Sequence, residues 1–175
     1  MIDIPNPTPT LLYSSTRDGG DFGTMMDKVG DASGLLFLVN HNDTHRFGSF
    51  VGGQLKSPAD GKYKVPLFFI SISGAYGQVT KVPIPEARQW VGVAGHDASI
   101  RFSTASRGKM TIALGYLWVA LGSPGPADDV RSMYQWVEKD DLPAGYLGRL
   151  SGNGTLAGTW YFTAKEIAIY QVKSG

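Results

Sequence analysis

The chain has 175 residues and a formal net charge of +1, with 42% hydrophobic and 18% charged residues. This length predicts one domain with a sizeable core, and the near-neutral charge, without any run of Lys or Arg, excludes an electrostatic basis for binding nucleic acid. The absence of cysteine excludes disulfides, zinc–thiolate sites, iron–sulfur clusters and a cysteine nucleophile.

Residues 1–10 are polar and rich in proline, which predicts an extended N-terminal arm, and residues 11–175 are expected to form a single domain. The arm lacks the apolar core of a signal peptide, and no apolar run in the chain approaches the roughly 20 residues of a membrane-spanning helix. We therefore expect an intracellular, cytoplasmic protein without membrane insertion.

The remaining chain shows mostly the two-residue periodicity of strands, interrupted by turns. The predicted strands are residues 34–40, 46–52, 66–73, 78–82, 89–94, 98–103, 110–121 and 160–172. Asp21 is placed to cap a helix that ends near Val29, and a second helix is predicted over residues 128–138. The last strand is too apolar to lie unpaired, so it is expected to close a sheet near the segment that begins at Leu11.

These elements predict a mainly β fold with short helices, arranged as a two-sheet antiparallel β-sandwich. The 23 Gly and 10 Pro residues agree with such a fold because they supply its many turns. The predicted core residues are Leu36, Leu38, Phe68, Ile70, Ile112, Phe162 and Ile167.

One set of residues is suited to chemistry: His96 and Asp97 together with Asp18 and Glu166. An imidazole beside carboxylates can bind a divalent metal or act in acid–base catalysis, as in a hydrolase or lyase. However, the chain has no Gly-x-Ser-x-Gly, His-Glu-x-x-His or P-loop motif. We favour a structural role, in which His96 and Asp97 fix a tight glycine turn and Arg17 pairs with a carboxylate. No catalytic residue, metal or cofactor is therefore assigned.

The aromatic residues offer a different class of function. Trp90 and Trp136, with Arg17, are the candidate binding residues, because an exposed aromatic ring can stack on a sugar or fill a partner's pocket. A carbohydrate-binding β-sandwich is accordingly an alternative function. Trp118 and Trp160 are interpreted as packing residues, since the first lies inside an apolar strand and the second opens the last strand.

Several motifs, taken in order, resemble the TLDc domain. They are Leu11-Leu-Tyr13 with Thr16-Arg-Asp-Gly19, then Phe22, Met25 and Met26, then Leu35–Val39, Asn42-Asp43 and Phe47–Phe50, then Leu67–Ser71, Gly92–Asp97 and Phe162–Tyr170. Residues 105–156 show no such resemblance, and the glycine run before His96 is interrupted by Val93 and Ala94. The resemblance rests on order and spacing across most of the chain.

The TLDc resemblance implies a β-sandwich whose function is interaction with other proteins. Domains of this family are associated with protection from oxidative stress, and several bind the V-type proton ATPase. No catalytic reaction is shared across the family. The resemblance therefore implies a non-catalytic interaction domain with a protein partner, and the V-type proton ATPase is the partner that it suggests.

Overall fold

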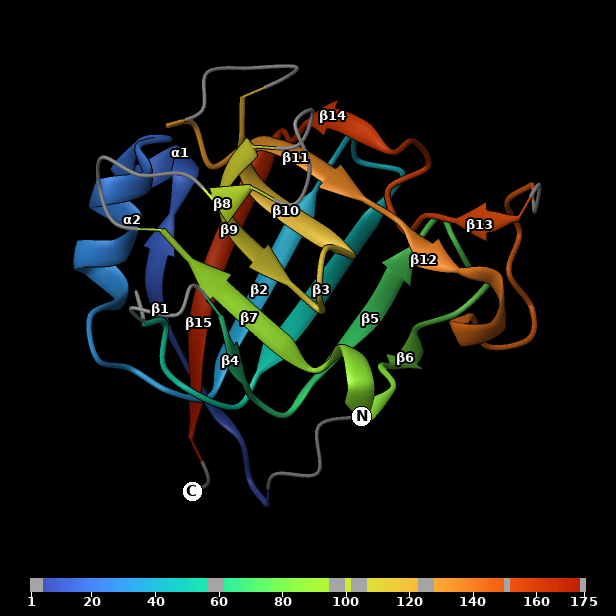
Figure 1. The fold of residues 1–175 in the computed structure, drawn as a ribbon, viewed down its shortest axis with the longest axis horizontal. Helices are drawn as coiled ribbons and strands as arrows, with labels where there is room; N and C mark the ends of the chain where they lie inside the picture. The colour runs from blue at the N-terminus through green and yellow to red at the C-terminus, as the bar shows by residue number, and fades with distance from the viewer. Residues whose placement is uncertain are drawn as a thin grey trace.

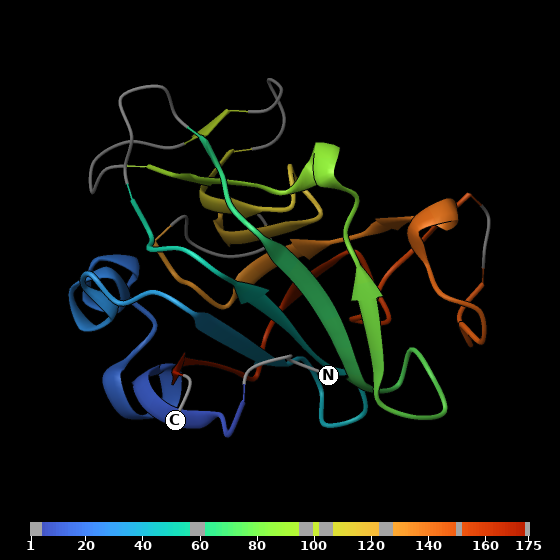
Figure 2. The same ribbon diagram turned by 90° about the horizontal axis from the view of Figure 1, so that it is seen from below.

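Two antiparallel β-sheets stacked in layers form the body of the protein (Figures 1 and 2). The computed structural model describes residues 5–56, 62–94, 100–101, 107–122, 128–149 and 152–173. The predicted two-sheet, mainly β architecture with short helices is confirmed. No helix among these residues is long and apolar enough to span a membrane.

The first sheet has six strands in the order β1-β15-β2-β3-β5-β6. They are β1 (Thr8–Ser14), β15 (Glu166–Lys173), β2 (Leu35–Asn40), β3 (Arg46–Val51), β5 (Leu67–Ser73) and β6 (Thr80–Pro83). Every neighbouring pair is antiparallel. β1 begins at Thr8, opposite Lys173, so residues 8–10 of the predicted arm belong to the sheet. The two ends of the chain pair with each other, as the alternation predicted.

The second sheet has seven strands in the order β14-β11-β10-β9-β7-β4, with β8 also paired to β9. They are β14 (Tyr161–Thr163), β11 (Ser132–Gln135), β10 (Leu117–Leu121), β9 (Arg107–Ile112), β7 (Trp90–Val93), β4 (Tyr63–Lys64) and β8 (Ile100–Arg101). A small two-stranded sheet joins β12 (Val137–Glu138) to β13 (Asn153–Gly154). Short 3₁₀ helices span Glu86–Arg88 and Lys139–Asp141.

The predicted first helix is present as α2 (Phe22–Val29), next to the single turn α1 (Ser15–Asp18). The Asp21 carboxylate caps α2 by accepting a hydrogen bond of 2.7 Å from the backbone N–H of Thr24. Phe22, Met25 and Val29 are buried on one face, as their spacing predicted. Both helices lie beside the edge of the six-stranded sheet at β1 (Figure 1).

The predicted helix over residues 128–138 is wrong, because this segment forms β11 and β12. Val130, Met133 and Val137 are buried, which fits a helical spacing, yet Ser132 and Gln135 are buried as well. β11 pairs with β10 on one side and β14 on the other, so its backbone groups are satisfied in the sheet. Tertiary pairing thus overrides the local helical pattern.

Two predicted strands are each divided into two. The run 110–121 folds back on itself at Ala113-Leu-Gly115, where all three residues have positive φ, and gives β9 and β10. The run 160–172 is interrupted at Ala164 and Lys165, where the chain passes from the seven-stranded sheet to the six-stranded one. The two-residue periodicity of the sequence continues across this point, so it could not show where the chain crosses from one sheet to the other.

The core lies between the two sheets. Three of the predicted core residues are buried there, namely Ile112, Phe162 and Ile167, each at most 4% exposed. The prediction is wrong for Leu36, Leu38, Phe68 and Ile70, which are partly exposed. In β2 and β5 the core face instead carries the alternate residues Leu35, Phe37, Val39, Leu67 and Phe69. Both faces of these strands are apolar, so alternation could not show which face is buried.

Candidate functional site

The polar residues that follow β1 build a structural corner. Tyr13 is fully buried and donates its hydroxyl to the carbonyl of Gly19. Burial is the main cause that raises the pKa of the Tyr13 hydroxyl to about 12, with smaller contributions from Asp129 and Asp18. A phenol in this state is a permanent hydrogen-bond donor at neutral pH, so Tyr13 fixes the turn around α1.

Arg17 and Asp18 form the hydrogen bonds and ion pair that the sequence predicted. The Arg17 guanidinium donates to both carboxylate oxygens of Asp18, at 2.9 and 2.6 Å, and to the carbonyl of Leu12 at 2.8 Å. The backbone N–H of Ser14 donates to Asp18 at 3.0 Å. The bonds from Arg17 and then from Ser14 lower the pKa of the Asp18 carboxyl to about 2. This carboxylate is ionised and fully occupied.

Glu166 lies at the same end of the six-stranded sheet, at the start of β15. Its carboxylate accepts hydrogen bonds from the hydroxyls of Ser14, at 3.1 Å, and Thr16, at 3.0 Å. The structure therefore brings Asp18 and Glu166 together around Ser14. His96 and Asp97, the other members of the predicted set, lie outside the described residues. Within the described ranges no group of three His, Asp or Glu side chains is placed to hold a metal ion.

The candidate aromatic residues lie in different surroundings. Trp90 is partly buried in β7, with the Lys62 ammonium 5.5 Å from its ring centre. Trp136 packs against the core, meets Tyr116 edge to face at 4.8 Å and donates its indole N–H to Gly115. Trp118 is buried, as predicted.

Trp160 is not a packing residue, which corrects the prediction. It is 43% exposed and precedes β14 rather than lying inside a strand. The sequence signal that was missed is its position directly after the glycine-rich segment Gly152–Gly158, which contains β13 and leads into β14.

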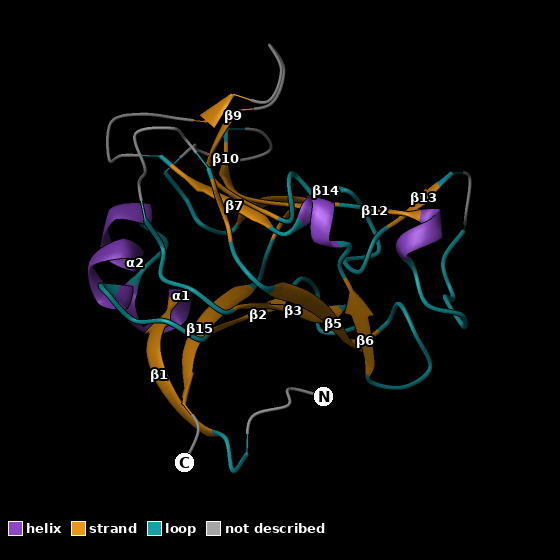
Figure 3. Cartoon of the chain, turned by 60° about the horizontal axis from the view of Figure 1, so that its bottom comes forward, coloured by secondary structure: helices purple, strands orange, loops and turns teal. Residues whose placement is uncertain are grey.

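A first surface feature is the outer face of the six-stranded sheet, which points away from the second sheet (Figure 3). We define the outer face by its apolar residues Leu11, Leu36, Leu38, Phe50, Phe68, Ile70, Pro83, Ala168 and Tyr170. All of them are at least partly exposed. Pro83, Phe68, Phe50, Leu36, Tyr170 and Leu11 stand opposite one another in register from β6 to β1. Directly opposite side chains share a face, so one apolar row crosses all six strands.

The outer face is ordered by its own contacts. The rings of Phe50 and Phe68 stack with centroids 5.3 Å apart, and the Lys81 ammonium lies 4.4 Å from the Phe68 ring centre. A hollow of about 200 Å³ at one end of the face is lined by Leu38 and Tyr170, together with Arg46 and Glu166. The face thus combines an apolar centre with charged groups of both signs at its end.

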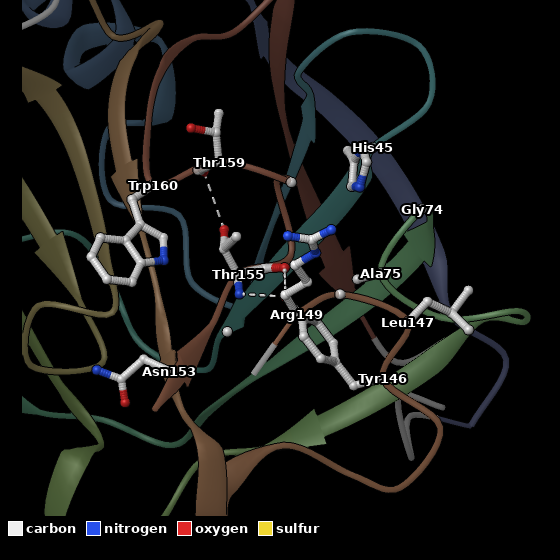
Figure 4. A pocket seen from close by; sticks show the side chains of 13 residues that line it. His45, Gly74, Ala75, Tyr146, Leu147, Arg149, Asn153, Thr155, Thr159 and Trp160 are labelled. Atoms are coloured by element: carbon white, nitrogen blue, oxygen red, sulfur yellow. Dashed lines mark hydrogen bonds between the residues drawn. The ribbon is translucent and has the colours of Figure 1, made fainter. Parts of the chain in front are cut away.

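A second surface feature is a pocket of about 520 Å³ between the end of β5 and the loop that precedes β14 (Figure 4). Its side-chain lining includes His45, Tyr146, Leu147, Arg149, Asn153 and Trp160. The His45 ring fits between Gly74 and Gly158, both at positive φ; a Cβ at either position would lie within 2.8 Å of the ring. Burial, and secondarily His41, lowers the pKa of His45, so its imidazole is neutral at pH 7.

The comparisons with known proteins agree with the motifs at the N-terminal end. Residues 3–72 match the family model of the TLDc domain. The match extends from β1 into β5 and includes the Arg17–Asp18 corner, so the TLDc resemblance is confirmed for this part of the chain. A search of curated proteins found no significant match.

Proposed function

We propose that this chain is a non-catalytic protein-interaction domain of the TLDc type that binds its partner through the outer face of the six-stranded sheet. The observation that carries the proposal is the apolar row from Pro83 to Leu11, which crosses all six strands and is open to solvent in the described structure. A contiguous apolar patch of this kind is typical of an interaction surface.

The strand composition supports this reading. β2 has the sequence Leu-Leu-Phe-Leu-Val-Asn, and β5 begins Leu-Phe-Phe-Ile, without apolar–polar alternation. Strands of this composition are characteristic of sheets that are covered on both faces. The second sheet covers only one face, and burying the other on a partner removes its apolar side chains from water, which is the main driving force of association.

The TLDc resemblance supplies the first partner to test. We take the V-type proton ATPase as that partner and oxidative-stress protection as the cellular role, with the protein acting inside the cell. The binding face supports contact with a folded protein because it is broad and carries charged groups at its end, Arg46 and Glu166, that can set the orientation of a partner.

A hydrolase or lyase mechanism through Asp18 and Glu166 is less well supported. The Asp18 oxygens are taken by Arg17 and the Ser14 backbone, and Glu166 accepts from two hydroxyls. Both Asp18 oxygens are thus bonded, whereas the two hydroxyls donate to the same Glu166 oxygen, Oε1. We therefore assign Asp18, with Arg17, to fixing the turn from β1 into α1, and Glu166 to holding β1 against β15 through Ser14.

The proposal is tested by measuring binding of the purified chain to the soluble sector of the V-type proton ATPase by interferometry. Leu38→Ser and Phe68→Ser each remove apolar surface from the outer face and are expected to weaken binding by about tenfold or more, as for central interface residues. Tyr161→Ser is the matched control, because Tyr161 is aromatic and 54% exposed but lies in β14 of the seven-stranded sheet, away from the outer face.

Equal loss in the Tyr161→Ser control, or unchanged binding in both outer-face variants, would contradict the proposal. Light scattering of the free chain adds a second readout. A stable dimer that dissociates on Phe68→Ser would assign the outer face to self-association instead of to a different protein.

A further inference from the structure

The pocket of about 520 Å³ shares no lining residue with the hollow on the outer face and is not used by the proposed protein interaction. We propose that it binds a small carbohydrate that carries a carboxylate, a sugar acid, through Arg149 and Trp160. The volume lies in the range of natural small-molecule sites, which is roughly 300–1,000 Å³.

The floor of the pocket is rigid. The Tyr146 hydroxyl donates to the Thr155 carbonyl at 3.0 Å and accepts from the Thr155 N–H at 2.9 Å. The Thr155 hydroxyl donates in turn to the buried Gln135 amide oxygen at 2.8 Å, and the same oxygen accepts from the N–H of Leu156. These polar groups already have partners, so the floor is a preorganised surface rather than a set of groups awaiting a ligand.

The mouth of the pocket is different. Trp160, Arg149 and Asn153 line it (Figure 4), and within the described ranges none of their side chains makes a hydrogen bond or ion pair. Together they offer a guanidinium, an indole N–H and an amide. These are mainly donors, which suits a ligand rich in acceptor oxygens.

The positive charge of the pocket lining favours an acidic ligand. Arg149 is its cation, His45 is neutral at pH 7 because burial lowers its pKa, and the lining contains no Asp or Glu. A guanidinium binds a carboxylate through two parallel hydrogen bonds, which an alcohol group cannot match. A cationic ligand would meet only repulsion from this residue.

The partial exposure of the pocket-lining residues favours a ligand with a hydrophilic ring. Trp160 is 43% and Leu147 66% exposed, so a ligand in the pocket keeps part of its surface in water. An apolar aromatic acid would gain little from such partial burial, whereas a pyranose can place its C–H face on the Trp160 ring and its hydroxyls in solvent. The combination of an open indole face and an unpaired guanidinium therefore favours a sugar acid.

The experiment uses glucuronic acid and glucose as probes, because the two sugars share one ring and differ in the carboxylate. Saturation-transfer NMR and calorimetric titration of the full chain are expected to show binding of glucuronic acid and at least about tenfold weaker binding of glucose, the worth of a charge-assisted bond. Acetate, which lacks the ring, is expected to show no competition at equal concentration.

Substitutions in the pocket lining test whether glucuronic acid binds in this pocket. Arg149→Gln is expected to reduce glucuronic acid affinity by about tenfold, and Trp160→Ala by about threefold to tenfold, from loss of the stacked face. Arg46→Gln and Tyr161→Ala are the matched controls, since Arg46 is an exposed arginine and Tyr161 an exposed aromatic residue outside the pocket lining. Thermal melting confirms that each variant folds.

Three results would overturn the proposal: no binding of glucuronic acid by the wild-type chain, equal affinity for glucose, or equal losses in the variants and their controls. Phe68→Ser, on the outer face, is expected to bind glucuronic acid normally. Its behaviour separates failure of this proposal from failure of the proposed protein interaction.

Discussion

The outer surfaces of the two sheets differ in a way that neither sequence composition nor fold class explains. In the seven-stranded sheet, β10 is buried on both faces, with Trp118 2% and Ala120 0% exposed. In the six-stranded sheet, β2 is as apolar as β10, yet Leu36 and Leu38 on its outer face remain partly exposed. The chain buries both faces of β10 and leaves the outer face of β2 partly open, and under the proposed function a partner supplies the missing layer.

The largest expected effect is on stability, and it comes from comparing substitutions on the two faces of β5. Phe69 is fully buried, whereas its neighbour Phe68 is partly exposed and stacks on Phe50. Phe69→Ala is expected to lower the free energy of unfolding by about 3–5 kcal/mol, because it leaves a cavity in the core. Phe68→Ala is expected to cost only about 1 kcal/mol, the worth of an aromatic pair. Urea unfolding measures both, and equal losses would show that the outer face is part of the core.

Stability measurements on two tryptophan variants test in the same way whether the outer face of the seven-stranded sheet is covered. Trp118→Ala is expected to cost about 3–5 kcal/mol, since Trp118 is as buried as a core residue. Trp160→Ala is expected to cost clearly less than Trp118→Ala, about 1–2 kcal/mol, because part of the Trp160 side chain is already in water in the folded protein. The same unfolding experiment applies. A small loss for Trp118 would mean that the outer face of the seven-stranded sheet is open too, and the comparison between the sheets would fail.

The sequence predicted the arrangement of two paired sheets better than it predicted which face of each strand is buried. The pairing of the chain ends, the Asp21 cap and the Arg17–Asp18 bonds all follow from local chemistry, and the structure contains them. The face of β2 and β5 could not be predicted, because both sets of alternating residues are apolar. The fold of residues 128–138 depends on the pairing of β11 with β10 and β14. Because β14 lies far from β11 in the sequence, local patterns could not reveal this pairing.

The candidate sites were harder to predict than the fold. The outer face needs the register of six strands before its apolar row becomes visible. The pocket joins His45 and Gly74 to residues beyond 145, and no local motif connects these segments. Trp160 was misassigned because its alternation continued that of the following strand, although the chain changes sheet between them.

A smaller effect tests whether the polar end of the six-stranded sheet is structural. The folded-state pKa of Asp18 is about 2, below its ordinary value of 3.8. A depressed carboxyl pKa stabilises the fold above the unfolded-state value, and this stabilisation is lost as the pH falls from about 4 to about 2. Asp18→Asn is therefore expected to melt at a lower temperature than wild type at pH 7, with a difference that shrinks across this window.

Asp27→Asn is the control for that melting series, because Asp27 is exposed and makes no ion pair within the described residues. It is expected to melt like wild type at every pH. If Asp18→Asn also melted like wild type at pH 7, the corner of Arg17 and Asp18 would be free for binding, and the outer face would no longer be the better-supported interaction surface.

The central claim is that the outer face is open in the free protein and covered by a partner. Because the chain has no cysteine, a single engineered thiol reports accessibility without background. Leu38→Cys places that thiol on the outer face, and Tyr161→Cys places it at a residue that is 54% exposed outside the face. Thiol alkylation rates are measured for both variants, free and saturated with the soluble sector of the V-type proton ATPase.

We predict that both thiols react in the free, folded protein and that the complex protects Leu38→Cys while Tyr161→Cys reacts as before. An unreactive Leu38→Cys in the free protein would contradict an open outer face. Protection of Tyr161→Cys without protection of Leu38→Cys, in a complex whose formation is verified by interferometry, would place the interaction elsewhere on the molecule.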